Sequence, residues 1–543
     1  MIFRSPYPSV DVPRVTLHDF VLGGAAARGD ASAFVDGATG RALSYVQLVD
    51  QVRRLASGLA NRSIRQGDVV AIFSPNTPEY AVVFHAVSRL GAILTTVNPT
   101  YTVGELAFQL KDAGARLLFT TAALLEKAQA AIAATGAAIE LITIDQADGV
   151  QSLASTLVDA EPPAVTIDPD LDIVVLPYSS GTTGLPKGVM LTHRNLVANL
   201  LQIDAMEASN LRALLGVLPF FHIYGMVVIM NHGLLRGATV VTLPRFDLET
   251  VLRIIQDYPI ALAHVVPPVV IAFAKHPLVD RYNLSNLRWL FSGAAPLGSE
   301  ITGTVETRLS IKVRQGYGMT ETSPVTHYTP AGGERTGKVG LLAPSTELRI
   351  VDPLTGADLD VGAAGEVWVR GPQVMKGYLN NPEATALTVD AEGWLHTGDI
   401  GIVDAEGYLE VVDRLKELIK VKAFQVAPAE LEAVLLKHPK IADAAVFGVP
   451  DEDCGEVPKA IVVMREPLTC EEVMAFVELH VAPYKRLRYV AFAEAIPKSP
   501  SGKILRRVLV AAERSGGNPS LSAEAPGAKV EGLPPQQVVA PKS

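Results

Sequence analysis

The first third of the chain alternates between two hydrophobic periodicities. Apolar residues at steps of three and four predict helices over residues 44–59 and 79–90. Short apolar runs at residues 68–73 and 117–121 are typical of buried strands. Strands that alternate with helices predict a mostly parallel sheet with helices on both faces.

The alternation resumes after a proline-rich connection at residues 161–169. Strands are predicted at residues 173–177, 263–266, 287–291 and 311–314, and polar or glycine-rich turns follow them. Ligands bind beyond the carboxyl ends of strands in open α/β sheets, so chemistry is expected in these turns.

Beyond about residue 335 the pattern changes twice. Residues 366–370 alternate with a period of two, which predicts a small antiparallel β unit. A separate α+β module follows; its predicted elements are a helix from Pro428 to Leu436, strands over residues 444–449 and 460–464, and a helix after a capping box of Thr469 and Glu472.

Composition narrows the class of protein. The 543 residues correspond to about three or four domain-sized units, and the net charge of −10 argues against a nucleic-acid-binding protein. The two cysteines, Cys454 and Cys470, lack metal-site spacing and indicate reduced thiols of a cytoplasmic protein. Neither a signal peptide nor a run of about 18 apolar residues is found, so no transmembrane segment is expected.

A loop rich in glycine and hydroxyl side chains follows the strand at 173–177. Its backbone N–H groups, hydroxyls and single lysine suit the binding of a triphosphate. It is not the P-loop of ATPases, because Pro186 precedes the lysine and Gly188 follows it. The candidate phosphate-binding residues are Ser179, Ser180, Gly181, Thr182, Thr183, Gly184 and Lys187.

Further motifs combine small residues with single functional groups. They are residues 220–225 around His222, residues 292–296, residues 315–321, residues 394–399 followed by Arg414, and residues 500–505 around Lys503. In the third motif, Tyr317 can stack on a nucleotide base, and Glu321 is a hard oxygen ligand suited to Mg²⁺.

In this order, the motifs resemble those of the adenylate-forming enzymes, which include acyl-CoA synthetases, adenylation domains of peptide synthetases and luciferases. The resemblance extends from about residue 15 to 510, and it is closest to the 4-coumarate:CoA ligases through residues 221–225, 416–420 and 424–432. Two departures from the family's pattern concern the site. Val421 and Ala423 replace a Tyr and a Gly, and the resemblance implies that this Gly lines the pantetheine path. Val227 and Phe291 replace the Asn and Lys often found in plant acyl pockets.

The resemblance implies an α/β fold with a large N-terminal AMP-binding domain and a small mobile α+β lid. The expected parts are doubly wound α/β subdomains at about residues 1–165 and 166–334, a small β-barrel at 335–413, a hinge at 414–416 around Lys416, a lid at 417–511 and a disordered tail at 512–543.

The resemblance also implies the site residues. Catalytic roles are expected for Lys503, His222, Thr320 and Glu321. Besides the loop residues, the expected ATP and AMP site contains Gly293, Ala294, Ala295, Pro296, Gln315, Gly316, Tyr317, Gly318, Thr320, Asp399, Arg414, Lys420, Gln425 and Lys503. The expected acyl pocket contains Tyr224, Val227, Leu262, Phe291, Gly293, Ala294, Gly316, Gly318, Pro324 and Val325. The expected CoA and thioester face contains Lys420, Lys422, Ala423 and Phe424, and the expected magnesium ligands are Glu321 and Thr183.

The function implied is that of an ATP-dependent acid:CoA ligase, which forms an acyl-adenylate and then an acyl-CoA thioester. A cinnamate- or hydroxycinnamate-type acid or a medium-chain fatty acid is the expected substrate, with ATP, Mg²⁺ and coenzyme A, in a cytoplasmic monomer or homodimer that binds no nucleic acid. Two alternatives stay open: an adenylating enzyme with another acceptor, such as a carrier-protein loader or luciferase-like oxygenase, and a nucleotide-binding regulatory protein without catalysis.

Overall fold

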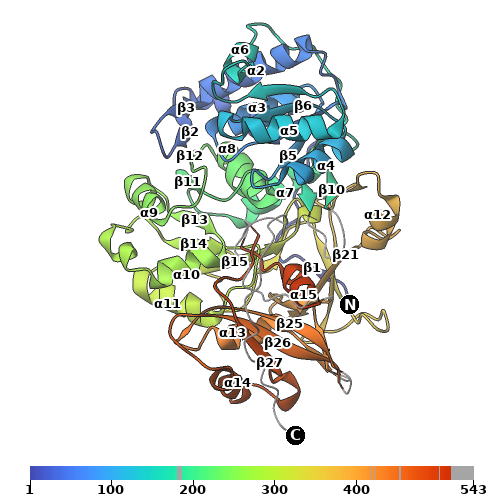
Figure 1. The fold of residues 1–543 in the computed structure, drawn as a ribbon. Coiled ribbons are helices and arrows are strands. Elements are labelled where there is room, and N and C mark those ends of the chain that lie inside the picture. Colours follow the sequence, from blue (N-terminus) through green and yellow to red (C-terminus); the bar gives the residue numbers. More distant parts are fainter. Residues whose placement is uncertain (180–185, 416, 422–423, 452–453, 500–501, 515–543) are drawn as a thin grey trace. The chain divides into compact units, whose positions relative to one another are not determined.

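The computed structural model describes residues 1–179, 186–415, 417–421, 424–451, 454–499 and 502–514 (Figure 1). The chain divides into two compact units. The large unit contains Met1–Arg349, Trp368–Thr397 and Val403–Leu409, and the small unit contains Ile350–Val367, Gly398–Ile402 and Glu410–Ser543. The predicted α/β class is confirmed, whereas the boundaries predicted from sequence stay predictions.

An eight-stranded sheet forms the first layer of the large unit, with the order β20-β10-β8-β5-β4-β6-β7 and with β9 paired to β10. Its strands are β4 (Val69–Phe73), β5 (Ile93–Val97), β6 (Ala115–Thr120), β7 (Glu140–Thr143), β8 (Ile173–Val175), β9 (Tyr178–Ser179), β10 (Lys187–Thr192) and β20 (Gly377–Tyr378). The strands from β8 to β7 pair in parallel, as predicted, and β10 is antiparallel to β8, β9 and β20.

Helices cover both faces of this sheet. On β4, Val70 and Ile72 belong to the core that contains α2 (Tyr45–Asn61) and α3 (Pro78–Arg89). Ala71 and Phe73 belong to the core on the opposite face, which contains α4 (Val103–Ala113) and α5 (Leu125–Thr135). Alternate side chains of a strand point to opposite faces, so the continuous apolar run of β4 reflects burial on both sides.

Two further sheets complete the large unit's α/β part. One has the order β11-β12-β2-β3, with β2 (Ser32–Asp36), β3 (Ala42–Ser44), β11 (Ala213–Gly216) and β12 (Thr239–Thr242). The other has the order β13-β14-β15-β16-β17, with β13 (Leu262–Val265), β14 (Trp289–Ser292), β15 (Lys312–Gly318), β16 (Val325–Tyr328) and β17 (Leu341–Leu342). Because β13, β14 and β15 are parallel, the turns that follow them emerge at one edge.

The helices of this part are α7 (His193–Met206), α8 (His232–Arg236), α9 (Leu248–Asp257), α10 (Pro267–Lys275) and α11 (Ser299–Leu309), with a π-helical segment over Tyr224–Asn231. Helices α10 and α11 pack on β14 and β15 (Figure 1). The small β unit predicted after residue 335 is a sheet with the order β1-β18-β19-β21-β22, formed by Phe3–Arg4, Glu347–Val351, Ala364–Arg370, Leu395–Val403 and Leu409–Arg414.

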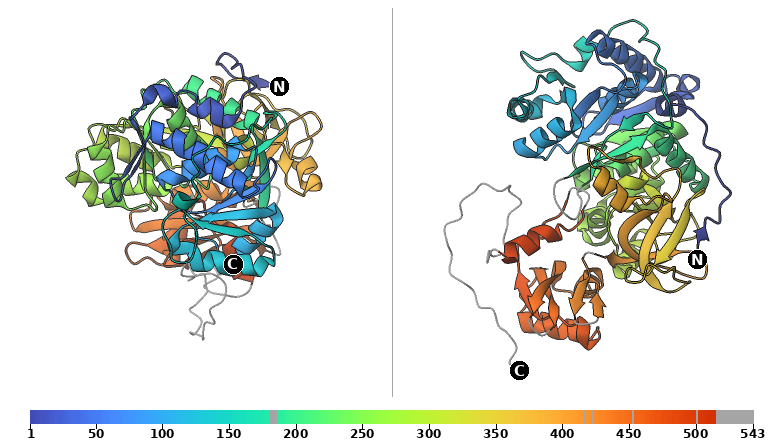
Figure 2. Two further views of the ribbon diagram at one scale, coloured as in Figure 1. Left: turned by 90° about the horizontal axis from the view of Figure 1, so that it is seen from above. Right: turned by 90° about the vertical axis from the view of Figure 1, so that its right-hand side faces the viewer.

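The small unit contains the predicted α+β module. Its sheet has the order β24-β23-β26-β25, and β27 pairs in parallel with β26. The elements are β23 (Ile419–Val421), β24 (Phe424–Val426), β25 (Ile441–Asp451), β26 (Gly455–Met464), β27 (Tyr489–Phe492), α13 (Pro428–Leu435), α14 (Cys470–Glu478) and α15 (Arg506–Arg514). The predicted capping box of Thr469 and Glu472 begins α14, and α15 lies against β25 (Figure 2).

A buried ion pair lies under the sheet of β13 to β17. The Arg314 and Glu207 side chains are fully buried, with Arg314 Nη1 2.9 Å from Glu207 Oε2. Arg314 Nε also donates to the Thr329 carbonyl, and the Tyr328 hydroxyl donates to the same Glu207 oxygen. Burial by itself would raise the pKa of Glu207, but Arg314 holds the pKa below its usual value, so the pair stays ionised.

Replacing Glu207 by Gln leaves the Arg314 charge buried without a counterion, so the free energy of unfolding should fall by about 3–5 kcal/mol. The measurement is the midpoint of urea unfolding followed by tryptophan fluorescence. Asp280→Asn is the control, because it breaks an exposed ion pair with Arg308 and should change the midpoint little. Equal shifts in the two variants would contradict the prediction.

Candidate active site

Two predicted nucleotide-binding motifs lie side by side at the carboxyl edge of the sheet. Ser292 at the end of β14 is in register with Gln315 of β15, so the turn at residues 293–296 adjoins residues 316–318. Within that turn Ala294 has a φ of 71°, an uncommon conformation for a residue with a side chain, and such strain concentrates at functional sites. A Cβ atom on Gly318 would lie 1.8 Å from the Pro324 carbonyl oxygen, so this approach requires glycine.

Glu321 is buried in the turn after β15, where two hydroxyls orient its carboxylate. Ser179 Oγ donates to Glu321 Oε1 at 2.9 Å, and the Tyr378 hydroxyl donates to the same oxygen at 2.8 Å. The structure therefore joins Ser179 and Glu321, which the sequence predicts for one site, and adds Tyr378, which the sequence analysis missed.

The surroundings of Glu321 fit a magnesium ion. Mg²⁺ in nucleotide enzymes is commonly held by one or two carboxylates and by substrate phosphates, with water completing the shell. Glu321 supplies an oriented carboxylate, and Ser179 at its side begins the predicted phosphate loop. The second predicted ligand, Thr183, lies outside the described residues, and the described residues contain no cluster of three or more acidic, histidine or cysteine ligands.

The described ends of the phosphate loop are held together by strand pairing. Ser179 of β9 is the antiparallel partner of Lys187 of β10. The Lys187 ammonium nitrogen lies 4.8 Å from the centre of the Tyr378 ring, in cation–π contact. The remaining loop candidates, Ser180, Gly181, Thr182, Thr183 and Gly184, lie outside the described residues.

Aromatic side chains form the predicted acyl pocket. The Tyr224 hydroxyl donates to the Phe291 carbonyl at 3.2 Å and lies 3.2 Å from His264 Nδ1. Cβ atoms on Gly293 and Gly316 would each lie 2.9 Å from an aromatic carbon, of Tyr224 and Phe291 respectively. The glycines therefore let two aromatic rings approach the backbone closely. His264 joins these rings and is a residue that the sequence analysis missed.

Burial keeps His264 neutral, because it lowers the pKa of the ring to about 3. Of the other predicted walls, Val227 follows Tyr224 in the π-helical segment, and Pro324 and Val325 lie at the start of β16, next to Gly318. Leu262 is the first residue of β13 and lies at the amino edge of the parallel strands, so the structure does not bring it to the turns at the carboxyl edge. Val227 and Leu262 are fully buried, and Val325 is nearly so.

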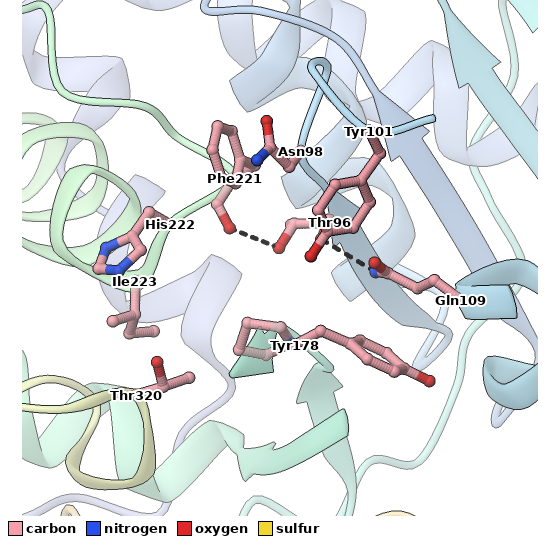
Figure 3. A pocket seen from close by; sticks show the side chains of 10 residues that line it. Thr96, Asn98, Tyr101, Gln109, Tyr178, Phe221, His222, Ile223 and Thr320 are labelled. Carbon is pink, nitrogen blue, oxygen red and sulfur yellow. Dashed lines mark hydrogen bonds between the residues drawn. The ribbon is translucent and has the colours of Figure 1, made fainter. Parts of the chain in front are cut away.

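A small cavity joins His222 to Thr320 (Figure 3). Its volume is about 30 Å³, which suits an ordered water rather than a substrate. Thr96 donates its hydroxyl to the Phe221 carbonyl at 2.8 Å, and Gln109 donates to the Thr96 carbonyl at 3.1 Å. Residues of the first sheet and its helix α4 therefore support the backbone next to His222. Sequence motifs alone do not reveal this contact.

In the small unit, Asp399 and Arg414 form an ion pair. Arg414 Nε lies 3.1 Å from Asp399 Oδ1, although the two residues lie on different strands, β21 and β22. The carboxylate is almost completely buried, and the arginine retains about a quarter of its exposure. The two residues that the sequence predicts for the ribose are therefore brought together.

Lys503 belongs to the same unit and lies among charged groups. Its loop is closed by hydrogen bonds between Lys503 N and Ser499 Oγ at 3.1 Å and between Ser499 N and the Lys503 carbonyl at 2.8 Å. Burial, reinforced by the Arg414 charge, lowers the pKa of Lys503 to about 8. Asp399 and Glu417 oppose that shift, so the lysine is mostly charged at neutral pH and loses its proton near pH 8.

Arg506, which the sequence analysis missed, anchors the segment that carries Lys503. Its guanidinium donates to both Glu432 carboxylate oxygens at 2.8 and 2.7 Å, pairs with Glu417, and donates to the Val446 carbonyl at 3.1 Å. Nη2 alone makes both bonds to Glu432, and the bonds of all three guanidinium nitrogens together hold the group in one orientation. The start of α15 is thereby tied to α13 and β25.

The remaining lid candidates lie around β23 and β24. Lys420 has an exposed side chain and donates its backbone N–H to Glu456, and its strand partner is Gln425. The side chains of Gln425 and Phe424, and all of Lys416, Lys422 and Ala423, lie outside the described residues.

Comparison with known proteins identifies the family. The family model described as AMP-binding enzyme matches residues 24–379, and that of the AMP-binding enzyme C-terminal domain matches residues 430–503. The chain belongs to the AMP-binding enzyme family. It is accordingly an enzyme, an AMP-forming acid–thiol ligase, as the sequence motifs predict.

Relatives of this AMP-binding enzyme align over nearly its whole length. It is 45% identical over 536 residues to 4-coumarate–CoA ligase 2 of Petroselinum crispum, covering 96% of this chain and 98% of the relative. It is 44% identical over 530 residues to 4-coumarate–CoA ligase 5 of Oryza sativa subsp. japonica, covering 94% and 96%. ATP-bound MatB from Rhodopseudomonas palustris superposes with a TM-score of 0.83 at 30% identity, covering 91% and 98%. Among the described residues of the AMP-binding enzyme, no helix has the length and apolarity needed to cross a membrane.

The lowered pKa of Lys503 predicts how the activity of the AMP-binding enzyme depends on pH. If the charged lysine assists adenylation, kcat/KM for ATP in acid-dependent pyrophosphate exchange should be constant below pH 8 and fall about tenfold per unit at higher pH, because the lysine loses its proton. Lys503→Arg should remove this alkaline limb, since arginine stays charged. An alkaline limb that persists unchanged in Lys503→Arg would assign the titration to another group.

Proposed function

We propose that this enzyme joins a cinnamate- or hydroxycinnamate-type acid to coenzyme A in two steps that use ATP, with medium-chain fatty acids as the second substrate class. The observation that carries the proposal is the 45% identity to a 4-coumarate–CoA ligase over almost the entire chain, the small unit included. In the first step a carboxylate oxygen attacks the α-phosphorus of ATP and pyrophosphate leaves. In the second step the CoA thiol attacks the acyl carbon and AMP leaves.

Residues of both units would stabilise the negative charge that develops in the first step. Negative charge gathers on the α-phosphate in the transition state, and fixed cations and hydroxyls stabilise it most when they are oriented beforehand. Lys503 and Lys187 would supply the cations and Thr320 a hydroxyl. When bound, Mg²⁺ held by Glu321 and phosphate oxygens would neutralise further charge.

The other predicted contacts position the substrates. Asp399 can accept hydrogen bonds from the ribose hydroxyls, with Arg414 at its side. His222 would contact the carboxylate of the acid and its adenylate. A lid that turns about Lys416 would present Lys503 for adenylation and residues 422–424 for thioester formation.

The molecule that accepts the acyl group distinguishes this proposal from its alternatives. CoA consumption that matches pyrophosphate release supports the ligase. Pyrophosphate release with carrier loading or light emission, and without CoA consumption, would identify another acceptor. A protein that binds nucleotide but releases no pyrophosphate with any acid would be the regulatory alternative.

Lys503→Ala should slow acid-dependent pyrophosphate exchange by about 10²–10³-fold, because one oriented cation is lost at a developing charge. The variant should still convert a presynthesised acyl-adenylate and CoA to the thioester, since Lys503 acts only in adenylation. Lys485→Ala is a matched control, because Lys485 forms an exposed ion pair with Glu430 elsewhere in the lid. An equal loss in both half-reactions of Lys503→Ala would contradict a lid with two working states.

The acyl pocket should favour acids without a hydroxyl on the ring. Val227 and Phe291 offer no hydrogen-bonding side chain, and the Tyr224 hydroxyl is already engaged by the Phe291 carbonyl and His264. A hydroxyl buried without a partner is disfavoured, although an apolar pocket rejects it by no more than about 100-fold. Cinnamate or a medium-chain fatty acid should therefore equal or exceed 4-coumarate in kcat/KM, and caffeate should be poorer.

Val227→Asn should shift this preference toward hydroxylated acids by supplying a hydrogen-bonding group. Val227→Ala is its control, because it enlarges the pocket without adding polarity. The measurement is kcat/KM for cinnamate, 4-coumarate and caffeate in each variant. A tenfold preference of the unmodified enzyme for caffeate over cinnamate would overturn the pocket assignment while leaving the ligase activity intact.

A further inference from the structure

Tyr378 contacts two charged groups: Lys187, at one end of the phosphate loop, and Glu321, which accepts a hydrogen bond from Ser179 at the other end. Its hydroxyl donates to Glu321 Oε1 at 2.8 Å, and its ring face lies 4.8 Å from Lys187 Nζ. The side chain is nearly completely buried.

The backbone of Tyr378 is held from several sides. It pairs with Val189 of β10, and the next residue, Leu379, donates its N–H to the Gly188 carbonyl at 2.8 Å. Tyr378 N donates to Thr385 Oγ1 of α12 (Pro382–Thr388) at 2.9 Å. Strand β10, which contains Lys187, therefore also fixes the position of the Tyr378 ring next to that lysine.

This arrangement keeps two opposite charges apart. Lys187 and Glu321 are contacted by different parts of one rigid phenol, and no ion pair within 4 Å joins them in the part of the chain that the structure describes. A direct pair would neutralise both groups and occupy the donors and lone pairs that phosphate and metal require. The phenol instead leaves a cation on one side and a carboxylate on the other.

We propose that Tyr378 is a positioning residue that separates Lys187 from Glu321, so that the site binds the metal–nucleotide complex in preference to the free nucleotide. The proposal rests on the proposed adenylation function, because it assigns Lys187 to phosphate and Glu321 to Mg²⁺. Its two contacts have separate consequences. The hydroxyl orients the metal ligand, and the ring positions the phosphate-binding cation.

Two variants separate these contacts. Tyr378→Phe removes the hydroxyl and keeps the ring, whereas Tyr378→Leu removes both. Losing a hydrogen bond to a metal ligand commonly weakens metal binding by about 10–100-fold. Tyr378→Phe should therefore raise by about tenfold the Mg²⁺ concentration that half-maximally promotes ATP binding, with little change in the ATP dissociation constant at saturating Mg²⁺. Tyr378→Leu should also weaken ATP binding at saturating Mg²⁺ by about two- to fivefold, through the lost cation–π contact.

The measurement is calorimetric titration of ATP into the full chain without acid or CoA, at a series of Mg²⁺ concentrations. Ser179→Ala, which removes the other hydrogen bond to Glu321 Oε1, should resemble Tyr378→Phe. Tyr282→Phe is the matched control, because it removes a tyrosine–glutamate hydrogen bond, to Glu249, at an unrelated surface.

A Mg²⁺ dependence in Tyr378→Phe equal to that of the unmodified enzyme would overturn the proposal, and so would an equal loss of ATP affinity at all Mg²⁺ concentrations. Tyr378→Phe is decisive even if Tyr378→Leu does not fold, because it retains the packing of the ring. An unmodified enzyme that bound ATP equally with and without Mg²⁺ would overturn the proposal alone. One that bound no ATP would overturn the proposed function as well.

Discussion

A buried arginine of β15 constrains the side chains around Phe291, a predicted wall of the acyl pocket. Arg314 lies in register with Phe291 of the neighbouring strand, and its guanidinium carbon is 5.4 Å from the centre of that ring. Phe291 in turn stacks on Tyr328 at 4.4 Å, and Tyr328 shares Glu207 with the arginine. A charge at this depth must remain paired, so the ion pair fixes the wall that Phe291 would give to the proposed acyl pocket. Tyr224 donates to the Phe291 carbonyl from a separate element, the π-helical segment.

The lysines of the two units have different electrostatic surroundings. In the large unit, the ring of Tyr378 contacts Lys187 and its hydroxyl donates to Glu321. In the small unit, Arg506 pairs with Glu417, one of the two carboxylates that stabilise the charge of Lys503. The arginine therefore competes with Lys503 for this carboxylate. A lysine that binds a phosphate, which is the role proposed for both residues, is most effective while no carboxylate of the protein neutralises it.

Sequence patterns predicted which segments form helices and strands better than they predicted which strands pair with one another. Hydrophobic periodicity gave α2, β4 and the α/β class, because it reports which face of an element is buried. It carries no information on pairing, and β2 pairs with β12 some two hundred residues later in the chain. Short motifs that resemble those of the adenylate-forming enzymes singled out Glu321 and Lys503, whose roles stay predictions. His264 was missed because it lies in an apolar strand, and Tyr378 because its strand of two residues carries no pattern. The partners that reveal Tyr378 and His264 are 57 and 40 residues away.

The surroundings of Lys503 indicate how the proposed lid would respond to the nucleotide. Burial and Arg414 disfavour the charged lysine and lower its pKa to about 8, while Asp399 and Glu417 favour the charge only in part. A triphosphate near these cations would reverse the balance, because an added negative charge stabilises both the lysine and the arginine. The unfavourable proximity of Lys503 and Arg414 would thus be relieved when an anion is bound and would return when it leaves. If the small unit acts as the lid proposed above, it has an electrostatic reason to engage the nucleotide before pyrophosphate departs and to disengage afterwards.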